Sequence, residues 1–135
     1  MPNRGPIDSK AMKLSPEDLD LFARLVHAEA AGEPFDGQVA VAASVINRVK
    51  NPRYPDTVRE VILEVIDGYY QYSPVLDGRI KLPANKSAQR AVRLALLGLD
   101  PTGGATGFYN PELTDDKWVR SQSVTKRIGN HIFFS

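Results

Sequence analysis

The sequence contains no cysteine, which excludes a disulfide scaffold, a thiol nucleophile and a zinc site with cysteine ligands. It has no apolar run near the roughly 18–20 residues that a membrane-spanning helix needs, so we expect no membrane span. The net charge is only +1 and no dense run of lysine and arginine occurs. This balance argues against a protein that binds the phosphates of nucleic acids.

The patterns that hold metals and cofactors are missing as well. The two histidines are isolated from each other, and HAEAA lacks the second histidine of the zinc-binding HExxH pattern. The run TGGATG lacks the lysine and the strand–helix context of a phosphate-binding loop, and we interpret it as a turn. The sequence therefore predicts no metal and no cofactor.

What the sequence does contain is the composition of one ordinary globular domain. It has 135 residues, of which 42% are hydrophobic and 24% are charged. Residues 1–14 lack the apolar run of a signal peptide, and we expect a flexible leader there, followed by one domain over residues 15–135. Either export uses no such signal, or the chain is a domain from a longer precursor.

Helical patterns dominate the first half of the domain. Ser15 can cap a helix that continues to about Ala31, where Gly32 and then Pro34 end it. A second helix is expected over residues 37–50. Because this segment is apolar on nearly every side, it is predicted to be the central, buried helix.

The second half mixes shorter elements. A short third helix is expected after Asp56 or Thr57, and a fourth over residues 87–97. The tyrosine-rich segment 67–79 is interpreted as irregular or short β structure. Short strands or extended segments are expected at 107–111 and 131–135. The fold class predicted from these elements is α+β, a mostly helical single domain with a small β element.

The first predicted helix carries a carboxylate on its apolar side. At about 100° per residue, Glu29 lies about 80° from Leu21, in the middle of the arc that Leu25, Phe22 and Val26 complete. An ionised, unpaired carboxylate is costly on a core-facing stripe, and the negative end of the helix disfavours it further. Both effects should raise the pKa of Glu29.

An acid that keeps its proton near neutral pH is what the cleavage of a glycosidic bond requires. The alternative is a structural Glu29, paired with an arginine or held by backbone amides, since structural networks also perturb pKa values. On the helix wheel alone both interpretations stay open. Gly32 and Pro34 indicate an exposed bend close by, which favours a functional site.

Several segments of the chain together resemble one family. The first is ARLVHAEAAGEPFDGQVAVAASVINRVKNPRYPDTV, and QYSPVLDG, LGLDPTGGATGFYNP, a tryptophan and RIGNHIFF follow in order. They are similar to the SleB/CwlJ cell-wall hydrolase family, the germination-specific spore-cortex-lytic enzymes, and closer to the SleB than to the CwlJ branch. The resemblance covers the chain from about Leu14 to Phe134.

The resemblance implies a lysozyme-like α+β fold and a peptidoglycan substrate, in particular cortex glycan that contains muramic-δ-lactam. It implies a lytic transglycosylase that leaves a 1,6-anhydromuramyl end, located in the spore envelope or cell wall. The family's catalytic Glu lies in an AExxGE motif, which here is Glu29. A similarity to the Glu-Ser-x-x-x-Pro motif of wider lytic transglycosylases also selects Glu29 over Glu33. The signal peptide and N-terminal peptidoglycan-binding domain usual in SleB-type proteins have no counterpart in this chain.

The remaining candidate residues have weaker patterns. Glu33 is a possible auxiliary carboxylate, although a structural role on backbone amides at the start of the second helix is favoured. Aromatic, amide and hydroxyl side chains suited to a sugar cleft are Gln71, Tyr72, Ser73, Tyr109, Asn110 and Trp118. Ordinary packing is the alternative for each of them. His27 is expected at the surface and His131 in a structural hydrogen bond.

Four functional interpretations stay open at this point. The favoured one is a transglycosylase that cuts the bond between N-acetylmuramic acid and N-acetylglucosamine. A muramidase or glucosaminidase would hydrolyse the same polymer, and a non-catalytic peptidoglycan-binding module would only hold it. A small helical interaction domain fits the composition but leaves Glu29 unexplained. We expect a monomer whose partner is peptidoglycan, restrained before germination by a regulatory protein that the sequence does not identify.

Overall fold

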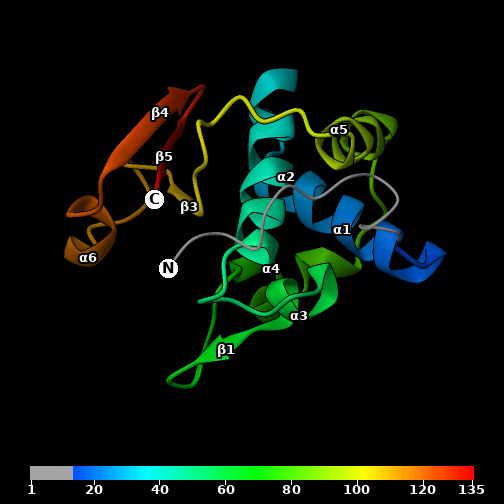
Figure 1. Cartoon of the computed structure of the whole chain (residues 1–135), viewed down its shortest axis with the longest axis horizontal. Coiled ribbons are helices and arrows are strands. Elements are labelled where there is room, and N and C mark those ends of the chain that lie inside the picture. Colours follow the sequence, from blue (N-terminus) through cyan, green and yellow to red (C-terminus); the bar gives the residue numbers. More distant parts are fainter. Residues whose placement is uncertain (1–13) are drawn as a thin grey trace.

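The computed structural model of the chain describes residues 14–135 (Figure 1). The leader predicted for residues 1–14 lies outside the described residues except for Leu14, which packs against the core. The helical segments, in chain order, are α1 (Pro16–Glu29), α2 (Phe35–Lys50), α3 (Val58–Leu63), α4 (Ser73–Asp77), the 3-10 helix η1 (Arg79–Lys81), α5 (Lys86–Leu96) and α6 (Lys117–Arg120). The strands are β1 (Val65–Ile66), β2 (Tyr69–Tyr70), β3 (Gly107–Tyr109), β4 (Val124–Ile128) and β5 (His131–Phe134).

Helix α1 begins and ends where its sequence favours a boundary. The Ser15 side chain accepts a hydrogen bond from the backbone N–H of Asp18 at 3.1 Å, and Pro16 occupies the first turn. The helix ends at Glu29, two residues before the predicted end, and Gly32 then takes a positive φ of 79° that favours glycine. The catalytic candidate is therefore the last helical residue, beside a bend.

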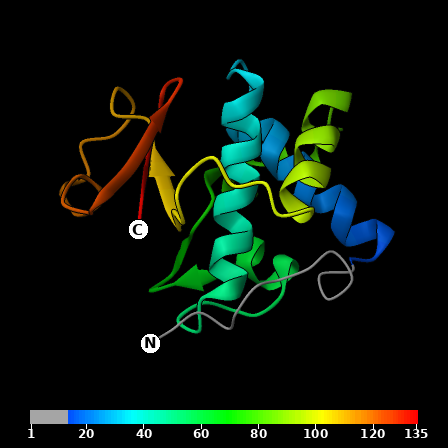
Figure 2. The same ribbon diagram turned by 45° about the horizontal axis from the view of Figure 1, so that its top comes forward.

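Helix α2 is the centre of the molecule, as the sequence predicts. Its residues from Val39 to Val49 are all buried, and the helices α1, α3 and α5 and the larger sheet pack around it (Figures 1 and 2). It begins at Phe35 rather than at the predicted Gly37. Pro34 precedes it as the N-cap. The alanines of α2 allow close packing against α5, which buries Ala88, Ala91, Val92 and Ala95.

The structure of the tyrosine-rich segment after α3 agrees only in part with the predicted irregular or short β structure. The predicted short β structure is present as the antiparallel hairpin β1–β2, with Val65 opposite Tyr70. The following residues, however, form the helix α4 and the 3-10 helix η1 rather than irregular structure. Proline in the first turn of α4 and Gly78 in the left-handed conformation after it are the local signals of this short helix.

The C-terminal part forms a three-stranded antiparallel sheet in the order β3-β5-β4. The predicted strands at 107–111 and 131–135 correspond to β3 and β5, whereas β4 and α6 were not predicted. Gly107 faces the ring of Phe134 so closely that an added Cβ would lie 2.3 Å from its Cζ atom. The observed mixture of helices and small sheets confirms the predicted α+β class.

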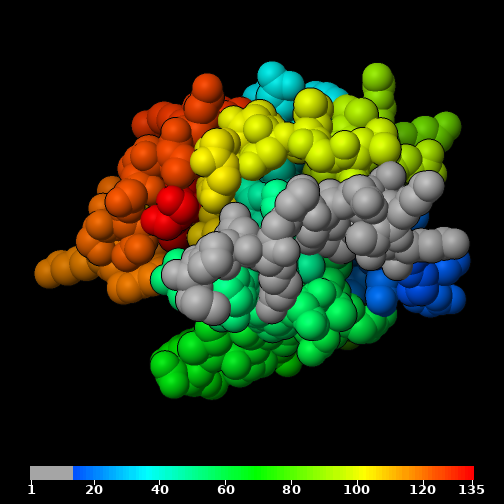
Figure 3. Space-filling view, in the orientation of Figure 1, coloured from blue at the N-terminus to red at the C-terminus, as the bar shows by residue number. Residues whose placement is uncertain are grey.

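The larger sheet and the helices α1 and α5 lie on opposite sides of α2 (Figure 1), and in the space-filling view the residues of the sheet and of α5 lie at opposite ends of the face shown (Figure 3). Within residues 14–135, no helix combines the length and apolarity that crossing a membrane requires.

Candidate active site

An open cleft of about 540 Å³ contains the side chain of Glu29. Residues from α1, β2, α4 and η1 line it together with residues from β3, β5, α6 and the segment that leads into α6. They are Glu29, Tyr70, Gln71, Ser73, Leu76, Arg79, Phe108, Tyr109, Asn110, Leu113, Thr114, Asp116, Val119 and His131. The cleft therefore brings together segments that are far apart in the sequence.

Glu29 lies at the C-terminal end of α1, partly buried and open to the cleft. The pKa of Glu29 is raised from 4.5 to about 7: burial is the largest cause, the Arg79 guanidinium partly opposes it, and the Asp77 carboxylate adds to the rise. The raised pKa that the helix wheel predicts is therefore confirmed. With a pKa near 7, a substantial fraction of Glu29 keeps its proton at neutral pH, which allows this residue to donate it.

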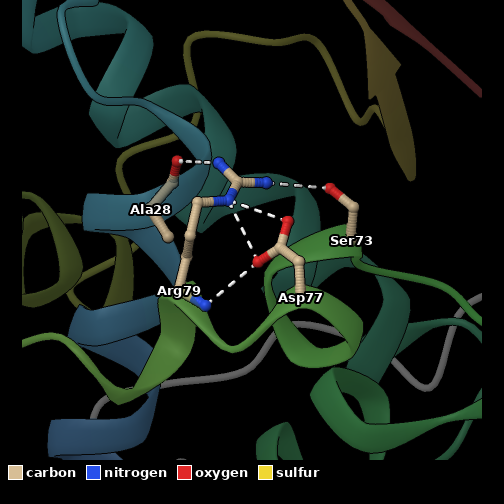
Figure 4. Close-up of polar contacts among 4 residues, drawn as sticks. All are labelled: Ala28, Ser73, Asp77 and Arg79. Carbon is tan, nitrogen blue, oxygen red and sulfur yellow. Dashed lines mark hydrogen bonds and ion pairs between the residues drawn. The ribbon is translucent and has the colours of Figure 1, made fainter.

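Arg79 connects the end of α1 to α4 (Figure 4). Its Nη1 donates a hydrogen bond to the carbonyl of Ala28 at 3.2 Å, and its Nη2 donates to the hydroxyl of Ser73 at 3.1 Å. Its Nε donates to Asp77 Oδ2 at 2.9 Å. The last carbonyls of a helix lack intrahelical partners, so a cation at this position stabilises the end of α1 next to Glu29.

Asp77 remains ionised in this arrangement. The backbone N–H of Arg79 donates to Asp77 Oδ1 at 3.0 Å, and this bond, together with the Arg79 guanidinium, holds the pKa of Asp77 below its usual range. Glu29 and Asp77 are two carboxylates on neighbouring elements whose pKa values are shifted in opposite directions. That separation makes Glu29 the carboxyl group that can carry a proton near neutral pH, while Asp77 stays negatively charged.

Four of the six predicted sugar-binding residues line the cleft with Glu29. They are Gln71, Ser73, Tyr109 and Asn110. Ser73 accepts a hydrogen bond from Arg79, so its hydroxyl hydrogen stays available to a ligand. Asn110 Oδ1 accepts from the backbone N–H of Glu112 at 2.9 Å, which leaves its amide donors for other partners.

Tyr72 does not line the cleft, and its position does not support the predicted direct contact with sugar. The residue is 3% exposed and lies in the core, with the guanidinium of Arg48 5.3 Å from its ring centroid. Burial raises the pKa of Tyr72 to about 12, Arg48 lowers it, and the charge of Glu29 raises it. At neutral pH the side chain of Tyr72 is therefore an uncharged phenol in the core, and its pKa depends in part on the charge of Glu29.

Trp118 also lies outside the set of residues that line the cleft. It is 63% exposed, so the alternative of a half-buried core residue is wrong. Its ring contacts Phe134 edge-on at a centroid distance of 6.1 Å. This exposed indole lies in α6, which directly follows the cleft residues Thr114 and Asp116.

The carboxylate of Glu33 is bound by the turn between β4 and β5. Its Oε1 accepts a hydrogen bond from the backbone N–H of Asn130 at 2.9 Å, and its Oε2 accepts from Asn130 Nδ2 at 3.0 Å. The predicted kind of partner, a backbone amide, is present, but it belongs to the β4–β5 turn rather than to the start of α2. Glu33 is not among the residues that line the cleft.

The two histidines differ from their predictions. His27 is partly buried, and its Nδ1 accepts a hydrogen bond from the backbone N–H of Asn85 at 3.3 Å. His131 lines the cleft, and its buried Nδ1 has no hydrogen-bond partner, so the structural bond predicted for it is absent at that atom. Among residues 14–135, no cluster of three histidine, cysteine or acidic residues could hold a metal ion.

Sequence reasoning missed Arg79 and Asp77, the two charged residues that act on Glu29. The available signal was the Leu-Asp-Gly-Arg run at 76–79, where a glycine that ends a helix is flanked by opposite charges. The helix α4 had not been predicted, so nothing indicated that this run would meet the end of α1.

The fold and this cleft define the class of the protein. The model of the Cell Wall Hydrolase family matches residues 32–134, and the chain belongs to that family. The match begins three residues after Glu29, so it establishes the family and assigns no role to Glu29.

Individual proteins that are similar to this chain support the same family assignment. The chain is 45% identical over 119 residues to a spore cortex-lytic enzyme of Halalkalibacterium halodurans and 40% identical to one of Bacillus subtilis, each match covering 88% of this chain. The matched region spans only 35% and 38% of those two proteins. The chain is thus similar to a part of each.

Two solved structures have the same fold. One is the catalytic domain of the germination-specific lytic transglycosylase SleB from Bacillus anthracis, with a TM-score of 0.83 and 41% identity over 90% of this chain and 97% of that domain. The other is the catalytic domain of the Bacillus cereus SleB protein, with a TM-score of 0.80 and 39% identity over 91% and 93%. The chain therefore has the fold of a SleB catalytic domain.

Proposed function

We propose that this protein is a lytic transglycosylase that cleaves the glycan strands of peptidoglycan, with the spore cortex as its substrate during germination. Residues 15–135 are its catalytic domain and Glu29 is its catalytic acid. The observation that carries the proposal is the position of Glu29, a carboxyl group with a pKa near 7 that opens into a large cleft. The similarity to spore cortex-lytic enzymes and to SleB catalytic domains supports the choice of substrate.

In the first step, protonated Glu29 donates its proton to the oxygen that links N-acetylmuramic acid to N-acetylglucosamine. The bond between that oxygen and muramoyl C1 breaks, and the N-acetylglucosamine portion leaves with a new hydroxyl group. The ionised Glu29 then accepts the proton of the muramoyl 6-hydroxyl while its oxygen bonds to C1. The product is a 1,6-anhydromuramyl end, Glu29 is protonated again, and no water is consumed.

The surroundings of Glu29 suit both steps. Burial keeps the carboxyl protonated before cleavage, and the nearby Arg79 guanidinium stabilises the carboxylate that forms after proton donation. The hydrogen bonds from Arg79 to Ala28 and Ser73 hold that guanidinium in place. Arg79 thus stabilises the charged intermediate form of the acid.

A mechanism with one carboxylate fits the state of the other acids. Asp77 is paired with Arg79, Glu33 is bonded to Asn130, and Asp116 caps α6 by accepting from the backbone N–H of Trp118 at 2.8 Å. Hydrolysis of the same bond would need a group that activates water. Asp116 is the carboxylate in the cleft that would serve a muramidase.

We further propose that the protein acts as a monomer in the spore envelope, where a regulatory protein restrains it until germination. The curated relatives extend well beyond the segment that this chain matches. Their additional length is a candidate source of the localisation and restraint that this domain would need.

Product analysis tests the proposed reaction. Purified protein is incubated with spore cortex and, separately, with vegetative sacculi, and the released fragments are identified by mass spectrometry. We expect 1,6-anhydromuramyl ends, formed faster from cortex. Reducing ends would establish a hydrolase instead, and binding to either polymer without release of fragments would establish a non-catalytic module.

A further inference from the structure

His131 occupies a position in the cleft that the proposed reaction does not use. It is the first residue of β5, it is 7% exposed, and it lines the same cleft as Glu29. Its ring packs against two aromatic rings, with centroid distances of 5.0 Å to Phe108 and 6.1 Å to Phe133. An imidazole held this firmly has a fixed direction for each of its two nitrogens.

The Nδ1 atom of His131 faces the protein interior. It is buried, makes no hydrogen bond, and lies 3.8 Å from Glu33 Oε1, which is too long for a hydrogen bond. The side chains of both residues are almost fully buried, with 9% of His131 and 6% of Glu33 exposed. Glu33 is therefore the charge that acts on the inner side of the imidazole.

The turn between β4 and β5 fixes the position of Glu33. Asn130 donates two hydrogen bonds to its carboxylate, one from the backbone and one from the side chain. Gly129 leaves the room that this requires, because an added Cβ there would lie 2.4 Å from Glu33 Oε1. The same turn leads directly into His131, so one local structure sets both the carboxylate and the imidazole beside it.

The carboxylate determines which nitrogen carries the proton. Burial holds the pKa of His131 below its usual range and the Glu33 charge only partly opposes this, so the ring is neutral near pH 7. A negative oxygen beside Nδ1 attracts an N–H group there and repels a lone pair. The proton is therefore assigned to Nδ1. No hydrogen bond to Nε2 exists among the described residues, which leaves its lone pair for a ligand in the cleft.

We propose that His131 is a substrate-binding residue whose Nε2 accepts a hydrogen bond from the glycan, and that Glu33 positions it by holding the Nδ1–H tautomer. The donors available on such a polymer are sugar hydroxyls and the N–H of acetamido groups. This inference rests on the proposed function, because it names a contact within the same cleft. It also gives Glu33 a role that is neither catalytic nor only structural.

Two substitutions separate the proposed contact from packing. His131→Phe keeps an aromatic ring against Phe108 and Phe133 but removes both nitrogens. His131→Gln places a side-chain amide, which contains an acceptor oxygen, near the position of Nε2. One neutral hydrogen bond corresponds to roughly a 3- to 10-fold change in affinity. We therefore expect H131F to raise KM for a soluble glycan tetrasaccharide by about that factor with kcat within about 2-fold, and H131Q to recover part of the loss.

The tautomer is tested separately by nitrogen NMR of the histidine side chains. The chain has only two histidines, so H131F identifies the signals of His131. We expect Nε2 to be the unprotonated nitrogen near pH 7 and its resonance to shift when the tetrasaccharide is added to E29Q, which should bind the glycan without cleaving it. A protonated Nε2, or a resonance that does not respond to the glycan, would overturn the proposal even if H131F failed to fold.

The outcomes also separate this inference from the proposed function. If the wild-type protein cleaves glycan but H131F has an unchanged KM, the assignment of His131 is wrong and the proposed function stands. A drop in kcat or in melting temperature without a change in KM would likewise contradict it, because a structural role predicts that pattern. If the wild-type protein neither binds nor cleaves glycan, both proposals fail together.

Discussion

The guanidinium of Arg79 donates a hydrogen bond to the carbonyl of Ala28 at 3.2 Å, one residue before Glu29. A cation is thereby placed at the negative end of α1, beside the carboxyl group proposed as the acid. It partly offsets the effect of burial, which on its own would raise the pKa of Glu29 further.

Removal of the Arg79 charge and removal of the Asp77 charge should shift the pH dependence of glycan cleavage in opposite directions. Cleavage requires protonated Glu29, so the rate should fall as the pH rises through about 7. Arg79→Met removes the cation that lowers the pKa, and the alkaline limb should move to higher pH. Asp77→Asn removes the anion that raises it, and the limb should move to lower pH. The measurement is kcat/KM against pH.

The matched control for that experiment is Arg93→Met, which removes an exposed arginine on α5 that does not line the cleft. Its pH profile should coincide with that of the wild-type protein. Shifts of the same sign in the Arg79 and Asp77 variants would contradict the electrostatic explanation.

Glu29→Gln should stabilise the folded protein at alkaline pH. The pKa of Glu29 is raised from 4.5 to about 7 on folding, so the stability it contributes is full below pH 4.5 and is lost as the pH rises through 7. The loss at pH 8 has an upper limit of about 3 kcal/mol. Urea unfolding at pH 4 and pH 8 checks this. A stability difference between the two proteins that does not depend on pH would show that Glu29 ionises freely in the folded state.

Glu33→Ala should destabilise the protein more than Asn130→Ala. The first change removes the acceptor of both Asn130 bonds, whereas the second leaves the backbone bond in place. Bonds to a charged group contribute roughly 1.5–3 kcal/mol each, so we expect a loss of about 3 kcal/mol for E33A and about half of that for N130A. Equal effects in chemical denaturation would mean that the backbone bond contributes little.

Gly107→Ala should destabilise the sheet because its new methyl group would overlap the Phe134 ring. Overpacking of this kind costs about 1–3 kcal/mol. Adding Phe134→Leu should recover part of the loss by shortening the side chain that the methyl meets. If G107A alone has the wild-type melting temperature, the close contact between β3 and β5 does not exist in solution.

The main helices and Glu29 could be predicted from the sequence because their signals are local. Ser15, Pro16 and the bend at Gly32 define α1, and the helix wheel shows the unusual position of the carboxylate without knowledge of its neighbours. Burial, the largest cause of the raised pKa, is predictable from the apolar arc on which Glu29 lies, whereas the charges of Arg79 and Asp77 come from other segments. Thr57 defines the start of α3 in the same way, whereas the Asn85 cap of α5 was missed, and α5 begins at Lys86, one residue before the predicted position.

The rest of the site depends on contacts between distant segments. Arg79 meets the end of α1 only because α4 and η1 fold back onto it, and a helix of five residues leaves little periodicity to detect. Tyr72 and Ser73 are adjacent in sequence, yet one is buried in the core and the other lines the cleft. The side-chain types of both residues are suited to sugar binding. The direction of the backbone at this point decides which side chain enters the core and which lines the cleft.

Comparison of Glu29→Gln with the wild-type protein on purified spore cortex tests the assignment of the catalytic acid. The substitution keeps the size of the side chain but removes the transferable proton. We predict that release of glycan fragments falls by at least about 100-fold, because general acid–base catalysis contributes about 10²–10⁴ to a rate. The circular dichroism spectrum should be unchanged. A correctly folded Glu29→Gln protein that solubilises cortex at the wild-type rate would contradict the role of Glu29.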